Sequence, residues 1–477
     1  AHCNLSDPDW RHTVDLFACE TASALAVIRD KASDLLDEDV KKSIVSEIEK
    51  RVISPMFFEN KEFGFECAAH NWNAVCMGSV GIVLLLMGEL FSDTGSLNGA
   101  LNRVQRSLKV YIDKAFSDDG ASLEGLGYYN YGMGFFVAFA KRLYEKTGGK
   151  EDLFDDPKIE RIAAFPAKMY FKNGSSVNFS DAATDEKLHP GMMRHLFKHT
   201  KKCYDIPHDA YFSFDSDSCY RFVPLYDDIE NEMYEGLENK EDLKLSGSRM
   251  DILEKAEWLI AESENSCGLA IKGGSNDEPH NHNDVGHFIY ISGDKVISAD
   301  LGAGEYTRDY FGDGRYGILC CSSLGHSLPV IDGQGQKAGK QHRADVFSVV
   351  RHGISDGKRE EAAEITIDMT SAYDMPYITN VTRKVVFGLK EGRLTVTDTV
   401  TSEKPADVKT RIVSFIDISG NLSAAGDFLA KRDVFSDHFG NKRDVNIYET
   451  EMEESNADLK ERDNRGFVYR ASYVLHP

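Results

Sequence analysis

The hydrophobic pattern of this chain changes its period partway along, and this change restricts the folds open to it. In the first third, apolar residues recur about every 3.6 positions, as Ile44, Ile48 and Val52 do, which is typical of helices that bury one stripe. In the second half, short stretches such as Arg393–Thr399 alternate apolar with polar residues between Gly, Asp and Asn turns. Roughly ten such stretches without helical crossovers predict antiparallel sheets packed as a sandwich.

We therefore expect an α+β chain of more than one domain, since 477 residues correspond to two or three domains at roughly 150 residues each. A helical domain is expected over residues 1–205 and an antiparallel β-sandwich over 256–477. The stretch between them, 206–255, is partly acidic and turn-rich. We interpret it as a linker or an excursion over the surface.

The charge balance limits the partners that this chain can have. Lys and Arg total 55 while Asp and Glu total 78, so the net charge is −23, which argues against a broad nucleic-acid or membrane-surface binder because both partners are anionic. The longest apolar run, from Met77 to Leu90, is too short and too interrupted to span a bilayer. We expect neither partner. The chain does not begin with Met and shows no signal peptide, so periplasmic, secreted and cytoplasmic locations and a homo-oligomeric state all stay open.

The strongest local signal is the segment His-Asn-His-Asn-Asp at 280–284. In an extended chain His280, His282 and Asp284 project to the same side. His282 together with the downstream Asp300 and His326 makes a plausible three-ligand zinc set of nitrogen and oxygen donors. The alternative is a polar loop whose histidines cap backbone groups.

A second signal is a run of tyrosines between glycines at the expected start of a helix, at 124–134. Tyr128 and Tyr131 are three residues apart and share a helix face, while Tyr129 points elsewhere. Glycines this close to a phenol suggest that another group approaches the backbone. The alternative is an aromatic packing cluster.

A third signal is His-Asn-Trp-Asn at 70–73, just before the most apolar expected helix. A His or Asn at a helix N-terminus can present a hydrogen-bond donor where the helix dipole favours an anion. The alternative is a simple N-cap by Asn71 or Asn73.

One chemistry accommodates all three signals, namely β-elimination at a uronic acid. The reaction needs a donor such as Asn or His to neutralise the carboxylate, a base such as Tyr or His to remove the C5 proton, and an acid such as Tyr to protonate the departing oxygen. A tyrosine base would need its pKa, ordinarily near 10, to be lowered by positive charge or strong donors. Positioned acid–base groups contribute about 10²–10⁴-fold to such a rate.

The motifs His-Asn-Trp-Asn, Glu-Gly-x-Gly-Tyr-Tyr-x-Tyr-Gly and His-x-His-Asn-Asp-x-Gly-x-Phe, in this order, resemble the heparinase II/III-like family of polysaccharide lyases, which includes oligo-alginate lyases. The resemblance spans residues 65–345, and its third motif is the most specific. It implies an incomplete α/α toroid followed by an antiparallel β-sandwich. It also implies a lyase that acts on an acidic polysaccharide or oligosaccharide.

Carried over to this sequence, the resemblance implies that His280 is the catalytic histidine. It implies that His282, Asp300 and His326 bind a zinc ion whose role is mainly structural. Tyr131 is favoured as the catalytic tyrosine because related lyases place it just before a glycine, with Tyr128 second.

The resemblance also implies that His70 and Asn71 neutralise the substrate carboxylate, although Trp72 stands where some members carry His. Asn178 and Asp181 lie in a segment similar to one that lines the family's cleft, and a structural turn is an equal alternative. The candidate substrate contacts are Trp72, Asn73, Tyr129, Arg315 and Tyr316.

The sequence thus predicts a lyase that cleaves a uronate glycan and releases an unsaturated uronate. Two alternatives stay open, a zinc-dependent glycan hydrolase with an open metal position and a glycan-binding protein without catalysis. Heparin or heparan sulfate, hyaluronan, chondroitin and alginate all stay open as the glycan, as do endo and exo action.

Overall fold

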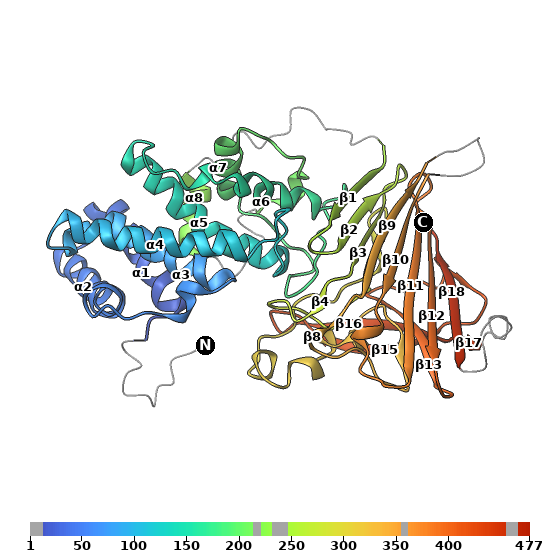
Figure 1. Ribbon diagram of the computed structural model, residues 1–477. Helices are drawn as coiled ribbons and strands as arrows, with labels where there is room; N and C mark the ends of the chain where they lie inside the picture. The colour runs from blue at the N-terminus through green and yellow to red at the C-terminus, as the bar shows by residue number, and fades with distance from the viewer. Residues whose placement is uncertain (1–12, 213–220, 231–246, 354–360, 455–465) are drawn as a thin grey trace. The chain divides into compact units, whose positions relative to one another are not determined.

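The computed structural model describes residues 13–212, 221–230, 247–353, 361–454 and 466–477 (Figure 1). The chain divides into two compact units. The helical unit comprises the described residues up to Ser122, Gly127–Ala167 and those between Lys187 and Asp242. The sandwich unit comprises Leu123–Leu126, Lys168–Glu186 and the described residues from Leu243 on. Parts of the predicted linker, 213–220 and 231–246, lie outside the described residues.

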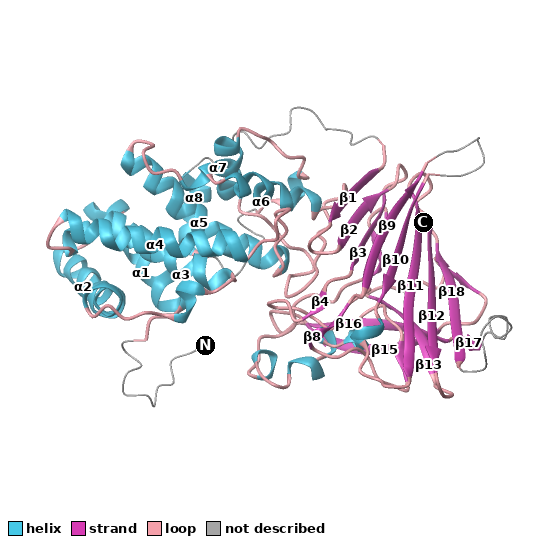
Figure 2. Cartoon of the chain, viewed as in Figure 1, coloured by secondary structure: helices cyan, strands magenta, loops and turns pink. Residues whose placement is uncertain are grey.

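The helical elements and the strands separate as the sequence pattern predicts (Figure 2). The α-helices are α1 Leu16–Lys31, α2 Glu38–Ile48, α3 Asn71–Leu86, α4 Thr94–Lys114, α5 Gly125–Thr147, α6 Pro157–Lys168, α7 Pro190–Thr200 and α8 Phe222–Glu230. The predicted order of helices first and antiparallel strands later is confirmed. The closed or open ring that a toroid requires stays a prediction. No helix among the described residues combines the length and the apolar character that a bilayer span needs.

Helix α3 forms the centre of the helical unit. Its residues from Asn73 to Leu85 are all buried, and it packs against α1 and α4. A glycine lets α5 approach it closely, because a Cβ at Gly78 would lie 2.7 Å from the carbonyl oxygen of Phe135. This close approach brings the start of α3 near the tyrosine segment of α5, where a Cβ at Gly132 would lie 3.4 Å from that of Asn71.

The strands of the sandwich unit form four antiparallel sheets. They are β1 Arg249–Leu253, β2 Trp258–Glu262, β3 Cys267–Lys272, β4 Ser275–Asn276, β5 Phe288–Ser292, β6 Lys295–Ser298, β7 Val330–Ile331, β8 Gly339–Arg343, β9 Val346–His352, β10 Ala362–Asp368, β11 Ile378–Gly388, β12 Leu394–Ser402, β13 Val408–Ser414, β14 Leu422–Ala424, β15 Leu429–Ser436, β16 Lys442–Glu451, β17 Glu453–Glu454 and β18 Phe467–Leu475. The orders are β1-β2-β3-β5-β6, β14-β18-β12-β11-β10-β9 with β17 beside β18, β15-β16-β13-β7, and β4-β8.

The two largest sheets share one hydrophobic core, which makes this unit a sandwich. Leu269 and Tyr290 of the five-stranded sheet belong to the same buried cluster as Val385 and Val396 of the seven-stranded sheet. Along β12, buried and half-buried residues alternate without a break, as the pleat of a strand requires.

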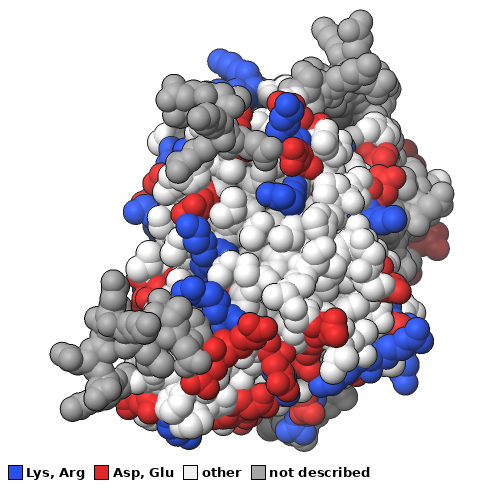
Figure 3. All heavy atoms as spheres, turned by 90° about the vertical axis from the view of Figure 1, so that its right-hand side faces the viewer, with Lys and Arg blue, Asp and Glu red and all other residues white. Residues whose placement is uncertain are grey.

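Figure 3 shows one side of the molecule with a wide central area that carries neither acidic nor basic side chains, and charges of both signs around it.

The segment Lys168–Glu186 belongs to the sandwich unit, although it precedes the predicted start of the strands. Two glycines with left-handed φ angles allow other parts of the sandwich unit to lie close to this segment. A Cβ at Gly125 or at Gly302 would collide with the carbonyl oxygen of Phe179 or of Ala182 respectively. Glu124 reaches the loop that follows β4, and Asp181 reaches both this loop and the one that follows β6.

A buried ion pair fastens these loops to the seven-stranded sheet. Arg383 and Asp398 are direct partners on β11 and β12, joined by two hydrogen bonds of 2.8 Å each, and both side chains are fully buried. The remaining Nη1 of Arg383 donates to the carbonyl oxygens of Gly286 (2.8 Å) and Ser327 (2.6 Å). One guanidinium thus holds the loop before β5 and the loop before β7.

Replacing Arg383 by Met should destabilise the protein by about 3–5 kcal/mol, because it leaves the Asp398 carboxylate buried without its counter-ion. The measurement is the free energy of unfolding from chemical denaturation. The control is Lys384→Met on the next residue, whose ion pair with Glu364 is half exposed and should contribute less than about 1 kcal/mol. Equal losses in the two variants would contradict this account.

Candidate active site and metal centre

The three predicted metal ligands lie together, and a fourth residue joins them. His282, Asp284, Asp300 and His326 each place a ligand atom within 4.8 Å of the others, and all four side chains are buried. Asp284 belongs to the His-x-His-x-Asp segment but was not among the predicted ligands.

The hydrogen bonds of the two histidines fix which nitrogen of each faces the cluster. His282 Nε2 lies 3.1 Å from a carboxylate oxygen of Asp181, and His326 Nδ1 lies 2.9 Å from the carbonyl oxygen of Ser322. Both acceptors require a proton on the nitrogen that they face. The lone pairs of His282 Nδ1 and His326 Nε2 are therefore exposed toward the cluster, and neither atom has a hydrogen-bond partner among the described residues.

The two carboxylates are arranged in the same way. Asp300 Oδ1 accepts from the backbone N–H of Gly302 (2.8 Å), and Asp284 Oδ1 accepts from the ammonium of Lys272 (2.7 Å). Their Oδ2 atoms are buried and lack a partner within the described part of the chain. Unsatisfied buried carboxylate oxygens are costly. Two imidazoles and two carboxylates fit a divalent zinc ion in charge, donor type and number.

His287 lies beside this cluster but does not have a ligand's geometry. Its Nδ1 accepts a hydrogen bond from the backbone N–H of Ser327 (3.1 Å), so a neutral ring carries its proton on Nε2. That nitrogen lies 3.5 Å from Asp300 Oδ2. Burial lowers the pKa of His287 far below its usual value and keeps the ring neutral. His287 therefore points an N–H toward Asp300 without forming a hydrogen bond to it.

A second group of possible ligands, Asp181, His282 and Cys321, is also compact and buried. Here Asp181 and His282 Nε2 already bind each other. Because the orphaned nitrogen of His282 is Nδ1, the first set of four ligands fits a metal better.

Asp181 is the hub of the hydrogen bonds around this centre. Its Oδ1 accepts from His282 Nε2, from the Tyr310 hydroxyl and from Arg315 Nη2 (2.8 Å), while its Oδ2 accepts from His280 Nδ1 (3.0 Å). Burial alone would raise the pKa of this carboxyl, but the hydrogen bonds from His280 and His282 outweigh burial and hold the pKa well below its usual range. One anionic side chain thus ties the predicted catalytic histidine to a predicted metal ligand.

His280 is held differently from the buried histidines around it. Its backbone has a φ of 60°, an unusual conformation for a residue with a side chain, and its ring is 18% exposed. With Nδ1 bound to Asp181, Nε2 faces the carboxylate of Glu124 at 3.6 Å. Nε2 is therefore the ring nitrogen through which His280 could exchange a proton with a ligand.

Arg315 and Tyr316 help to hold the loop that carries these histidines. Besides Asp181, Arg315 Nη2 contacts the carbonyl oxygen of Asn281 (2.9 Å), and the Tyr316 hydroxyl donates to the Asn281 side chain (2.9 Å). Both side chains are half-buried. Their predicted contact with substrate stays a prediction.

In the helical unit, Tyr131 has an anionic neighbour. Its hydroxyl donates to the Glu20 carboxylate, and the guanidinium of Arg221 lies 4.6 Å from its ring centre and 3.3 Å from Glu20. Burial and the charge of Glu20 raise the pKa of Tyr131 far above its usual value. The phenol therefore stays protonated, which suits an acid and not a base.

The other residues of this motif divide between core and surface. Tyr128 is half-buried, as Tyr131 is, whereas Tyr129 is fully buried and packs against Phe116 and Phe165. The predicted substrate contact of Tyr129 is therefore corrected to a packing role, because no part of its ring is open to a ligand.

The residues at the start of α3 also differ in exposure. Asn73 is buried, with its amide donating to the carbonyl oxygens of Glu66 and Ala68 and accepting from Ser107, so its predicted substrate contact is corrected to a structural role. Asn71 is buried at the first turn of the helix. His70 and Trp72 are half-buried, with their ring centres 6.5 Å apart.

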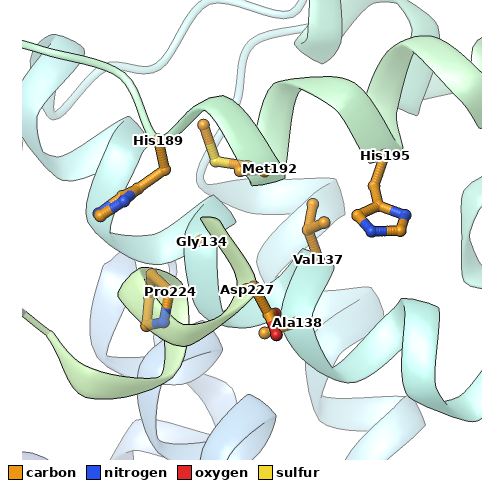
Figure 4. A pocket seen from close by; sticks show the side chains of 9 residues that line it. Gly134, Val137, Ala138, His189, Met192, His195, Pro224 and Asp227 are labelled. Carbon is orange, nitrogen blue, oxygen red and sulfur yellow. The ribbon is translucent and has the colours of Figure 1, made fainter. Parts of the chain in front are cut away.

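A small pocket in the helical unit lies among α5, α7 and α8 (Figure 4). It has room for about one water molecule. His195 lines it, and burial, aided by the charge of Lys141, lowers the pKa of this histidine to about 4, so the ring is neutral. Asp227, also in the lining, is paired with Lys141 (2.9 Å) and Arg142 (2.6 Å). None of the predicted site residues lines this pocket.

Comparison with solved structures identifies the architecture. The chain matches a heparinase III with a TM-score of 0.64 at 13% identity, over 97% of this chain and 69% of that one. The chain has the fold of heparinase III. Heparan sulfate lyase HepC from Pedobacter heparinus matches with a TM-score of 0.55 at 14% identity, over 100% and 70% of the two chains. A further heparinase III gene product matches with a TM-score of 0.59 at 12% identity, over 92% of this chain.

This likeness confirms the predicted resemblance to heparinase-like lyases at the level of the fold. The chain spans only 63% of the length of that last heparinase III. No protein-family model matches the sequence, and no curated protein does.

Sequence reasoning missed two carboxylates at His280 and one at the metal centre. Asp284 carried a signal, since the spacing His-x-His-x-Asp places it with His282. Glu124 opens the tyrosine motif, and Asp181 was noted only as lining or turn. Their meeting at His280 depends on chain segments that are far apart in sequence.

Asp300→Ala should lose the metal that the four ligands are expected to hold, and Asp181→Asn should weaken zinc affinity by about 10–100-fold because it releases His282. Zinc content by mass spectrometry and competition with a chelating dye measure both effects, and thermal melting reports the lost stabilisation. His342→Gln changes a buried histidine bonded to the Ser371 carbonyl and should keep its zinc. Full zinc occupancy in Asp300→Ala would refute the ligand set.

Proposed function

We propose that this chain is a polysaccharide lyase that cleaves a uronic-acid-containing glycan by β-elimination, with a glycosaminoglycan as substrate. One observation supports the proposal most. In a chain with the heparinase III fold, His280 offers a partly exposed imidazole whose Nδ1 is fixed on a buried carboxylate. The named neighbours are heparinase III and heparan sulfate lyase, both of which suggest an acidic glycan.

In the proposed reaction His280 is the base. Its Nε2 takes the C5 proton of the uronate, the electrons of the C5–H bond form the C4–C5 double bond, and the C4–O bond to the departing sugar breaks. The imidazolium that results lies between Asp181 and Glu124. The two carboxylates thus face the ring on which the proton would arrive.

The departing oxygen needs a proton, and a tyrosine of the helical unit is proposed to supply it. Tyr131 is the first candidate because its raised pKa keeps the phenol protonated, and Tyr128 is the second. The same rise in the pKa of Tyr131 disfavours a role as the base. After proton transfer, Arg221 over the ring would stabilise the phenolate.

The substrate carboxylate must be neutralised before the C5 proton can leave, and Asn71 and His70 stay the proposed donors. Their position at the first turn of α3 supports this role, since the backbone N–H groups and the dipole of a helix N-terminus favour an anion. The partly exposed ring of Trp72 beside His70 is proposed to contact the sugar.

The metal is proposed to be structural zinc held by His282, Asp284, Asp300 and His326. A bound zinc ion would supply positive charge that neutralises two buried carboxylates. Four protein ligands complete a tetrahedral site, and a catalytic zinc keeps one position open for water. Since all four ligands are buried, this ligand set favours a lyase over a zinc hydrolase. The helical unit is proposed to be an incomplete α/α toroid.

Incubation with a panel of heparan sulfate, heparin, hyaluronan, chondroitin and alginate should yield unsaturated uronate from at least one glycosaminoglycan. Its ultraviolet absorbance is the measurement. His280→Ala should lower kcat by about 10²–10⁴-fold with its fold intact. His352→Ala, on the half-exposed β9, is the matched control. Chain cleavage that produces reducing ends without the chromophore would mean hydrolysis and end the proposal.

Three separate tyrosine-to-phenylalanine variants distinguish the acid from its neighbours. Tyr131→Phe should lower kcat by about 10²–10⁴-fold if it donates the proton. Tyr129→Phe removes only a hydroxyl from the core and should leave kcat unchanged. If Tyr128→Phe carries the loss and Tyr131→Phe does not, Tyr128 is the acid.

A further inference from the structure

An exposed group of aromatic side chains lies on two loops of the sandwich unit. The loop 305–311 follows β6 and the turn 437–441 joins β15 to β16. We define the aromatic platform as the five rings on these loops, namely Tyr306, Tyr310, Phe311, His438 and Phe439. Tyr306 is central, with ring centres 4.2 Å from His438, 4.9 Å from Phe311 and 5.1 Å from Tyr310.

The outer rings of the platform are open to solvent. Tyr306 is 37% exposed, Phe311 55% and Phe439 57%, while Tyr310 is fully buried beneath them. Single exposed aromatics are ordinary, but a contiguous group of them marks an interaction site. Since these rings already pack edge to face on one another, the residual exposed faces are what a ligand could cover.

The backbone holds the platform in place. Gly304 and Asp437 form a β-bridge, and the backbone N–H of Glu305 donates to the Ser436 carbonyl (3.2 Å). The side chain of Asp437 caps the turn by accepting from the N–H groups of Phe439 (3.0 Å) and Asn441 (2.9 Å). A surface held in this way needs little ordering when it binds.

Buried hydrogen bonds connect the platform to the candidate active site. Its buried member, Tyr310, donates its hydroxyl to Asp181, and Asp181 accepts from His280 through its other oxygen. A single carboxylate therefore separates the platform from the proposed base. A polymeric ligand bound at His280 also covers surface beyond that residue. The platform is the exposed aromatic surface that is connected to His280 through Asp181.

The charges on the two loops select the kind of sugar. Glu305, Asp309 and Asp437 are acidic, and Arg308 is the basic residue among 305–311 and 437–441. The guanidinium of Arg315 lies 4.6 Å from the ring centre of Tyr310, but it is bound to the Asp181 carboxylate. The acidic excess of the two loops therefore disfavours a sulfated or carboxylated ring. The C–H face of a neutral pyranose suits an aromatic ring, whose face is electron-rich.

We propose that the aromatic platform binds an uncharged sugar ring of the same glycan, further along the chain than the sugars on either side of the bond that breaks. This inference rests on the proposed function and adds a subsite to it. It commits the platform to a neutral N-acetylhexosamine ring and not to a second copy of this chain.

The test compares Phe311→Ala, Phe439→Ala and the double variant with Phe17→Ala, an equally exposed aromatic on α1 of the helical unit. The substrates are size-defined heparan sulfate oligosaccharides of low and high sulfation. Each platform variant should raise KM for long, low-sulfate chains about threefold to tenfold with kcat unchanged. The shortest oligosaccharide should show no change, and Phe17→Ala should behave as wild type.

Binding of fluorescently labelled low-sulfate oligosaccharide to His280→Ala, with and without the platform substitutions, tests the subsite apart from catalysis. Weaker binding in the platform variants supports it even if the wild type proves not to be a lyase. Unchanged KM and unchanged binding would overturn the inference. A change in sedimentation from dimer to monomer in the variants, with binding intact, would assign the rings to self-association and overturn it as well.

Discussion

The carboxylate of Asp181 organises everything around the candidate active site. It is buried, it is anionic, and it accepts from four side chains that come from different parts of the loops before β5 and β7. A buried carboxylate is tolerable only when donors surround it. Those donors include the proposed base, a proposed zinc ligand, and the arginine and tyrosine that brace them, so the positions of all four are mutually dependent.

The candidate metal centre and the seven-stranded sheet show how these positions are held. Four orphaned ligand atoms point toward one another while every other polar atom of the same side chains is fixed by a partner, in the way expected of ligands prepared for a cation. Arg383 then joins the two ligand-bearing loops to β11 and β12. These hydrogen bonds fix the two loops to the sheet, although the loops themselves contain little regular secondary structure.

The sequence was sufficient for the order of helices and strands because the periods of 3.6 and 2 are local properties. It also grouped His282 with Asp300 and His326, which the structure brings together, since a His-x-His pair and distant acidic residues are recognisable by type. It did not place Glu124 and Asp181 beside His280, because that meeting depends on close backbone approaches of distant segments. The burial of Tyr129 could not be predicted either, since three tyrosines within four residues look alike until their neighbours in space are known.

The chain path has a consequence for how this protein can be divided. Glu124 and Asp181 belong to the sandwich unit but are encoded among the helices. A fragment cut at the predicted boundary would carry the histidines and the strands without either acidic neighbour. The strand-rich half is therefore not an independent module that evolution or an engineer can graft elsewhere with its chemistry intact, and recombination within this fold has to exchange both stretches of the gene together.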